Sequence, residues 1–183
     1  MKDKMRILIA YDGSKCADAA LTDLKRAGLP RNVEAHVLSV YGDWMPLPSS
    51  YGMVETSFTK YVQDWENGAL AMAERACLEL KSSFPDWEIG AEAGSGSPAG
   101  LILQKADALK SDLIVVGSHG RSAIGRLLLG SVSQKVLHAA HGNVRIARES
   151  TPESDTPIRL IIGLDGSAGA DAAVKAVAAR HWP

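Results

Sequence analysis

The sequence predicts an α/β protein with a doubly wound, parallel five-stranded sheet, and two observations support that fold class. Short, continuous apolar runs such as RILIAY (6–11) and DLIVVGS (112–118) alternate with segments whose apolar residues recur at helical spacing. Such runs are typical of strands that are buried on both faces of a parallel sheet. Regular alternation of strand and helix predicts right-handed crossovers that place helices on both faces. Ligands of such folds bind beyond the carboxyl ends of the strands, where the strand order reverses.

The bounds of the individual elements are predicted from residues that typically start or end helices and strands. Glycine and proline at 28–30 end the first helix, and Ser97-Pro98 marks the start of a later one. The mixture of glycine, proline and serine over 42–56 predicts a loop. The strands are expected over 6–11, 33–41, 87–93, 112–118 and 143–148, and the helices over 15–28, 56–83, 98–110 and 131–142.

An internal repeat follows the first domain, which we expect to span 1–148. The polar segment 149–158 contains two prolines and predicts a linker. Residues 159–173 then match residues 6–20 without a gap, at nine of fifteen positions, including the whole Asp-Gly-Ser turn. We therefore expect 159–183 to be the first strand and helix of a second, incomplete copy of the domain. The alternative is that this segment packs on the first domain and completes it.

Composition and charge exclude several classes of protein. The chain has 183 residues, 46% of them hydrophobic, and a formal net charge of −1, so no strong overall field attracts nucleic acid or an acidic membrane. The two cysteines, Cys16 and Cys77, fit a reducing compartment better than a disulfide framework. No apolar run reaches the length of a signal sequence or a membrane span. We expect a cytoplasmic protein without nucleic-acid or membrane partners.

The segment VVGSHGRSAIGRLLLGSVSQ (115–134) contains the most informative motif. Gly117 and Gly120 follow a buried strand, and Gly130 and Ser131 stand at the start of the next helix. Phosphate binding needs backbone N–H groups that converge without intervening side chains, and a helix N-terminus adds further donors. The four residues Gly117, Gly120, Gly130 and Ser131, here called the phosphate cradle, therefore predict an anion site, with Arg121 at its rim. The alternative is that the glycines only form turns.

The motif GSHG…GS, its flanks LIVVGSHGR and LLLGSVSQKVL, and the early ILIAYDGS resemble the nucleotide-binding branch of the universal stress protein family. The resemblance covers residues 5–148 and starts again at 159. It implies a flavodoxin-like, Rossmann-like strand order of 3-2-1-4-5 and a stress-response module that binds ATP or another adenine nucleotide. It also implies a homodimer or an intramolecular pair of tandem domains. The implied nucleotide-binding residues are Ala10, Tyr11, Asp12, Val40, Val116, Gly117, His119, Gly120, Arg121, Gly130, Ser131, Val132 and Ser133.

Within that set, the resemblance implies adenine and ribose near Tyr11, Asp12 and Val40, and phosphates over Gly120 and the start of the following helix. The sequence departs from the family at two places. Ala10-Tyr11 stands where members often have a proline, and Gly142-Asn143-Val144 replaces a frequent Cys-Pro-Val.

Three functions remain open at this point. The first is an ATP-binding module whose occupancy alters conformation or partner contacts. The second is a slow ATPase or nucleotidyl-transfer enzyme that uses His119 or Asp12, and the third is a structural dimerisation module with an empty pocket. No catalytic residue is nominated, because the cradle contains no evident base to position water and the chain has no Walker A motif. No histidine or cysteine set predicts a metal site, although magnesium could accompany the phosphates with Asp12 as its nearest carboxylate.

Overall fold

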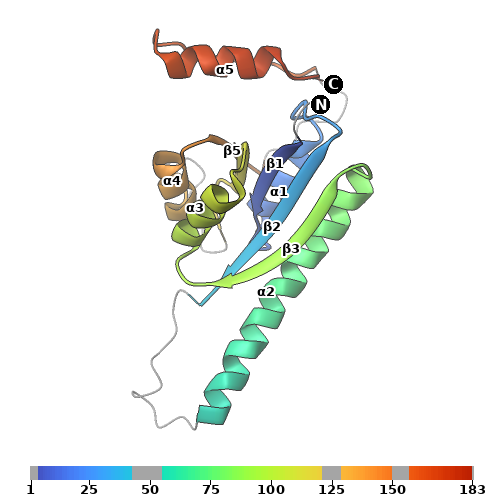
Figure 1. Ribbon diagram of the computed structural model, residues 1–183, viewed down its shortest axis with the longest axis vertical. Coiled ribbons are helices and arrows are strands. Elements are labelled where there is room, and N and C mark those ends of the chain that lie inside the picture. The colour runs from blue at the N-terminus through green and yellow to red at the C-terminus, as the bar shows by residue number, and fades with distance from the viewer. Residues whose placement is uncertain (1–3, 43–54, 121–128, 150–156, 183) are drawn as a thin grey trace.

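The computed structural model describes residues 4–42, 55–120, 129–149 and 157–182, and for residues 55–58 the backbone alone. It contains a five-stranded sheet in which every neighbouring pair is parallel. The strands are β1 (Met5–Ala10), β2 (Val33–Tyr41), β3 (Glu88–Ser95), β4 (Leu113–Gly117) and β5 (Asn143–Ala147). Their order, β3-β2-β1-β4-β5, confirms the predicted doubly wound fold and the 3-2-1-4-5 topology (Figure 1).

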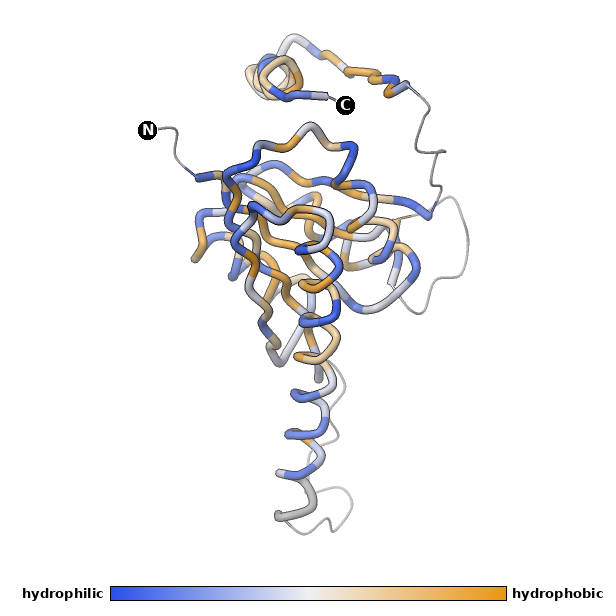
Figure 2. The backbone as a smooth tube through the Cα atoms, turned by 90° about the vertical axis from the view of Figure 1, so that its right-hand side faces the viewer, coloured by the Kyte–Doolittle hydropathy of each residue, from blue (hydrophilic) through white to orange (hydrophobic). Residues whose placement is uncertain are grey.

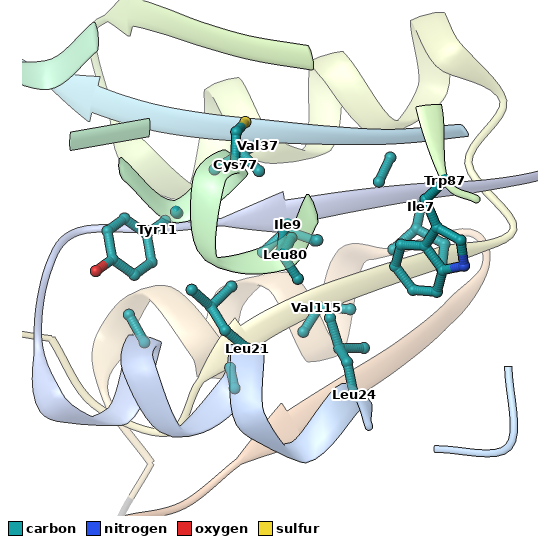
Figure 3. Close-up of a cluster of buried hydrophobic side chains, with 14 of the residues drawn as sticks. Ile7, Ile9, Tyr11, Leu21, Leu24, Val37, Cys77, Leu80, Trp87 and Val115 are labelled. Carbon is teal, nitrogen blue, oxygen red and sulfur yellow. The ribbon is translucent and has the colours of Figure 1, made fainter. Parts of the chain in front are cut away.

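The sheet is covered on both faces because successive residues of a strand point to opposite sides. Ile7 and Ile9 of β1, and Tyr11 directly after it, pack beneath α1 (Lys15–Leu24) and α2 (Glu55–Ser83), as Figure 3 shows for the labelled core residues. Leu8 and Ala10 face the other layer, formed by α3 (Pro98–Leu109) and α4 (Ser131–Ala139). Because helices cover both faces of the sheet, successive residues in the middle of a central strand are all buried, and that part of its sequence must therefore be apolar throughout.

Some element boundaries differ from those expected. The first helix ends at Leu24, after which a turn leads to Gly28 at φ +61°, and α4 ends at Ala139. Strand β3 continues to Ser95 because each of its residues pairs in register with β2, up to Tyr41 opposite Ser95. The pairing of β3 with β2 does not affect the spacing of hydrophobic residues, so the sequence pattern could not predict where β3 ends. The loop expected over 42–56 lies almost entirely outside the described residues.

The C-terminal segment stands apart from this core. Residues 168–178 form helix α5 (Ala168–Ala178), but the strand expected over 159–164 is not formed. A lone strand cannot satisfy its backbone groups without a neighbour, and Ile161 is 99% exposed. Helix α5 contains no buried residue and lies beyond one end of the sheet in both views (Figures 1 and 2). Two hydrogen bonds just after the helix attach it to the first domain: Arg180 donates to the carbonyl of Ala27 at 3.1 Å, and the His181 N–H donates to the carbonyl of Gly28 at 3.3 Å.

Helix α2 is longer than the sheet that it covers. Its buried residues begin at Ala69, while the preceding turns project beyond the carboxyl ends of the strands (Figures 1 and 2). Tyr61 and Trp65 are exposed on this projecting part. Among the helices that the structure describes, none combines the length and hydrophobicity that a membrane span requires.

Candidate functional site

A cavity of about 410 Å³ opens at the carboxyl ends of β1 and β4, the two strands between which the chain order reverses. This is the position at which folds of this class bind ligands. Twelve of the thirteen residues expected from the sequence line it, and Arg121 lies outside the described residues. The lining residues that were expected are Ala10, Tyr11, Asp12, Val40, Val116, Gly117, His119, Gly120, Gly130, Ser131, Val132 and Ser133.

Five further lining residues were not expected from the sequence, and all of them are apolar. Leu38 shares a face of β2 with Val40, so the two-residue strand period could have identified it. Pro98 and Ile102 belong to α3, and only the packing of that helix on the sheet brings them to the cavity. Ala17 and Leu129 complete the set. Together with Val40 and Val116, these residues give the cavity an apolar wall.

The start of α4 also lines the cavity, through Gly130, Ser131, Val132 and Ser133. Gly130 is the N-cap residue of this helix, and no side chain caps it. The first N–H groups of a helix have no partner within the helix, and they lie at the positive end of its dipole. A Cβ atom on Gly130 would lie 3.3 Å from both the Ser118 carbonyl oxygen and the His119 Cα atom. The glycine therefore allows the backbone of the loop after β4 to pack closely against the start of α4.

Gly117 and Gly120 differ in what they permit. A Cβ atom on Gly117 would lie 2.8 Å from the Cys16 carbonyl carbon and 2.9 Å from the Ala17 nitrogen, so this glycine allows α1 to pack against β4. A Cβ atom on Gly120 would lie 2.8 Å from Oδ2 of Asp12, which itself lines the cavity. The sequence assigned both glycines to the cradle. Gly117 is also needed for the packing of α1 against β4, and the position of Gly117 in the motif did not predict this role.

Asp12 has a local role besides its place in the cavity wall. Its Oδ1 atom accepts a hydrogen bond from the Ser14 N–H at 3.0 Å, which stabilises the turn between β1 and α1. Ser14 is in turn the N-cap of α1 and accepts from the Ala17 N–H. The carboxylate is thus held at the mouth of the cavity by the same turn that starts the helix.

The Tyr11 side chain points away from the layer of α3 and α4. Its ring lies at one end of the core cluster beneath α1 and α2, with the hydroxyl directed outward (Figure 3). The hydroxyl donates to Asp18 at 2.5 Å and accepts from Arg75 at 2.8 Å. Burial and the hydrogen bond to Asp18 raise the pKa of Tyr11. We infer that Tyr11 contributes its backbone to the cavity, rather than its hydroxyl.

Few groups at the site are suited to acid–base or metal chemistry. Of the lining residues that the structure describes, the ionisable ones are Tyr11, Asp12 and His119. The Nδ1 atom of His119 lies 3.1 Å from the Ser118 hydroxyl. No group of three or more metal-binding side chains occurs in the described parts of the chain. The lining combines a helix N-terminus, which suits an anionic group, with apolar side chains, which suit a flat apolar group.

The fold and the cavity define the class of the protein as a doubly wound α/β domain with a ligand-sized pocket at its topological switch point. The profile of the universal stress protein family matches residues 5–148, which is most of the chain. The chain belongs to the universal stress protein family.

Individual relatives agree with this assignment. A universal stress protein of Mycobacterium tuberculosis is 31% identical over 144 residues, which cover 79% of this chain and 45% of the relative. One from Methanocaldococcus jannaschii is 28% identical over 157 residues, which cover 81% of this chain and 84% of the relative. The present chain thus spans about half the length of the mycobacterial relative.

Solved structures of the family share the fold. The universal stress protein UspA of Lactobacillus plantarum superimposes with a TM-score of 0.65 at 24% identity, over 81% of this chain and all of that one. A family member from Arabidopsis thaliana, solved with AMP bound, gives a TM-score of 0.52 at 16% identity over 84% and 95% of the two chains. A universal stress protein in complex with cAMP gives 0.52 at 24% identity over 80% and 98%.

Proposed function

We propose that this chain binds ATP or another adenine nucleotide in the cavity at the carboxyl ends of β1 and β4. The observation that carries the proposal is the N-terminus of α4, which begins at Gly130, has no side-chain cap among the described residues, and lines the same cavity as a set of apolar side chains. A phosphate group matches the free N–H groups and positive dipole end of such a helix. The proposal is further supported by two structural relatives, which were solved with AMP and with cAMP.

The apolar lining residues and the start of α4 suggest how the nucleotide would lie in the cavity. Leu38, Val40 and Ile102 offer apolar side chains to an adenine ring, and the Asp12 carboxylate can accept a hydrogen bond from a ribose hydroxyl. The phosphates would lie over Gly120 and over the first turn of α4, from Gly130 to Val132. Magnesium bound there would keep several waters and use phosphate oxygens, with Asp12 as the carboxylate at hand among the described lining residues.

The same residues support a binding module more than a fast hydrolase. General base catalysis needs a side chain that is placed to take a proton from water. His119 is the one lining histidine in the described part of the cavity, and the described contacts place no carboxylate against it. We therefore propose that nucleotide occupancy changes the conformation or the partner contacts of the protein, including its association into dimers. Sedimentation velocity with and without ATP tests the effect on assembly.

Isothermal calorimetry with ATP, AMP and cAMP tests the binding itself. We expect the native protein to bind at least one of them, and Gly130→Val to weaken that binding at least about tenfold, because the new side chain would displace the backbone at Ser118 and His119, and His119 lines the cavity. Gly90→Val is the matched control, since a Cβ atom there meets nothing within 4 Å. A native protein that binds none of the three nucleotides, or a Gly130→Val variant that binds like the native protein, would overturn the proposal.

A further inference from the structure

Three successive carbonyl groups of the loop after β4 are each bonded to another part of the protein. The Gly117 carbonyl accepts from the Ser133 hydroxyl at 2.6 Å, and the Ser118 carbonyl accepts from the Gly130 N–H at 2.8 Å. The His119 carbonyl accepts from the Ser14 hydroxyl at 3.2 Å. A carbonyl oxygen that turned toward the cavity would repel an anionic ligand. The three bonds therefore keep this loop in a form that an anion can approach.

The Ser14 bond joins the two turns that form the mouth of the cavity. Ser14 belongs to the turn after β1 and His119 to the loop after β4, 105 residues apart in the sequence. The same hydroxyl accepts from the Ala17 N–H at 3.2 Å and so caps α1. A serine hydroxyl has one proton to donate and lone pairs to accept, so it can form both bonds at once. Ser14 itself does not line the cavity.

The geometry of the peptide bond connects Ser14 with the ligand side of the loop. The carbonyl of His119 and the N–H of Gly120 belong to one planar unit, and the described residues contain no cis peptide. In a trans peptide the C=O and the N–H point in opposite directions. Holding the His119 carbonyl toward Ser14 therefore turns the Gly120 N–H away from α1. Gly120 lines the cavity, and as a glycine it loses more backbone freedom when it is ordered.

We propose that Ser14 is a positioning residue for the nucleotide phosphates, and that it acts by orienting the peptide between His119 and Gly120. This inference rests on the proposed function of the cavity. Without the hydroxyl, the orientation of the peptide between His119 and Gly120 would be fixed only when ligand binds, and the entropic cost of fixing it would weaken binding.

The internal repeat supplies a control within the same chain. Ser167 caps α5 as Ser14 caps α1, because its hydroxyl accepts from the Ala170 N–H at 3.2 Å. Its own N–H donates to Asp165 at 2.9 Å, as that of Ser14 does to Asp12. The described part of the second copy contains no counterpart of the loop after β4. The two serines thus share the capping bonds and differ in the bond to His119.

Calorimetry on three variants tests the proposal. Ser14→Gly removes the hydroxyl, and glycine is itself an accepted N-cap, so α1 should remain folded. We expect its dissociation constant for ATP to rise between about twofold and tenfold, the range of one net hydrogen bond. Ser14→Thr, which keeps a hydroxyl, should restore affinity to within about twofold. Ser167→Gly should bind like the native protein.

Hydrogen exchange on the nucleotide-free protein supplies a second readout that does not depend on binding. The amides of Ser118 and Gly130, whose bonds to the carbonyls of Ala147 and Ser118 hold this loop, should exchange faster in Ser14→Gly than in the native protein, in Ser14→Thr or in Ser167→Gly. Native affinity in Ser14→Gly, unchanged exchange of these amides, or an equal loss of affinity in Ser167→Gly would overturn the proposal. If the native protein binds no adenine nucleotide, the proposed function fails, while the exchange result still decides whether Ser14 orients the loop.

Discussion

The three glycines of the cradle illustrate how one residue type serves different physical needs. At Gly130 the absent side chain allows the backbone at Ser118 and His119 to approach the start of α4, and at Gly120 it leaves room for the Asp12 carboxylate. At Gly117 it allows the backbone of α1, at Cys16 and Ala17, to approach β4. None of the three has a positive φ among the described residues, so close approach, and not a left-handed backbone, is the reason for glycine. Substitutions at these positions should therefore have different consequences.

At the residue scale, we predict that Gly117→Ala destabilises the fold. The new methyl group would meet backbone atoms of α1, which cannot move without displacing the helix. Overpacking of this kind costs about 1–3 kcal/mol in the free energy of unfolding, which urea denaturation measures as a lower midpoint. Gly90→Ala is the control, because its Cβ atom meets nothing within 4 Å. Equal midpoints for the two variants would contradict the assignment of Gly117 to helix packing.

At the scale of elements, Tyr11 connects β1, α1 and α2 beside the cavity. Its hydroxyl lies between Asp18 of α1 and Arg75 of α2. One turn earlier on α2, Met72 packs against Gly13, whose φ is +73° and where a Cβ atom would lie 2.9 Å from the sulfur. Helix α2 is thus anchored at the turn that carries Asp12, close to the point where the helix projects beyond the sheet. Under the proposed function, this arrangement would connect a ligand bound at Asp12 physically with α2.

The raised pKa of Tyr11 predicts how this anchor depends on pH. Burial is the main cause, followed by the hydrogen bond to Asp18, so the folded protein favours the neutral phenol. The resulting stability is fully present below the unfolded value of 10.0 and is lost as the pH rises through the higher folded value. Urea denaturation at a series of pH values above about 9 should show this loss, and Tyr11→Phe should reduce it. An identical pH dependence in Tyr11→Phe would contradict the prediction.

At the scale of the whole molecule, residues 157–182 contribute little to the folded core. The positions buried in α1, namely Ala17, Ala20, Leu21 and Leu24, correspond to Ala170, Ala173, Val174 and Val177, which are also apolar but not buried. In the first domain β1 is central and pairs with both β2 and β4. We propose that 159–182 begins a second copy of the domain, because its strand would need the same two neighbours in order to form.

We predict that a chain ending at Glu149 remains folded with nearly the same thermal midpoint as the full chain. Helix α5 buries no residue, so its removal costs little hydrophobic stabilisation. Removal of Leu160, Ile161 and Leu164, which are exposed, should also reduce self-association. Differential scanning calorimetry and sedimentation velocity measure the two effects. A large fall in the midpoint would instead support the alternative that this segment completes the first domain.

Much of the site could be predicted because its residues lie next to strand ends and helix starts. Periodicity located β1 and β4, and Asp12, Gly117 and Gly130 follow from their places in the motif. The contribution of α3 could not be predicted in this way, since Pro98 and Ile102 reach the cavity only through the packing of that helix on the sheet. The hydrogen bond from Ser14 to His119 could not be predicted from the sequence either, because it joins residues from separate strand–helix units.

The sequence by itself determined the alternation of strand and helix, the edge of the sheet at which a ligand would bind, and the repeat that begins at residue 159. These follow from spacing and from the backbone freedom of particular residue types, both of which are local properties. Only the tertiary structure decided that the Tyr11 hydroxyl faces Asp18 and Arg75, that Gly117 accommodates α1, and that residues 159–164 form no strand. Those outcomes depend on contacts between distant segments, which exist only once the layers have packed.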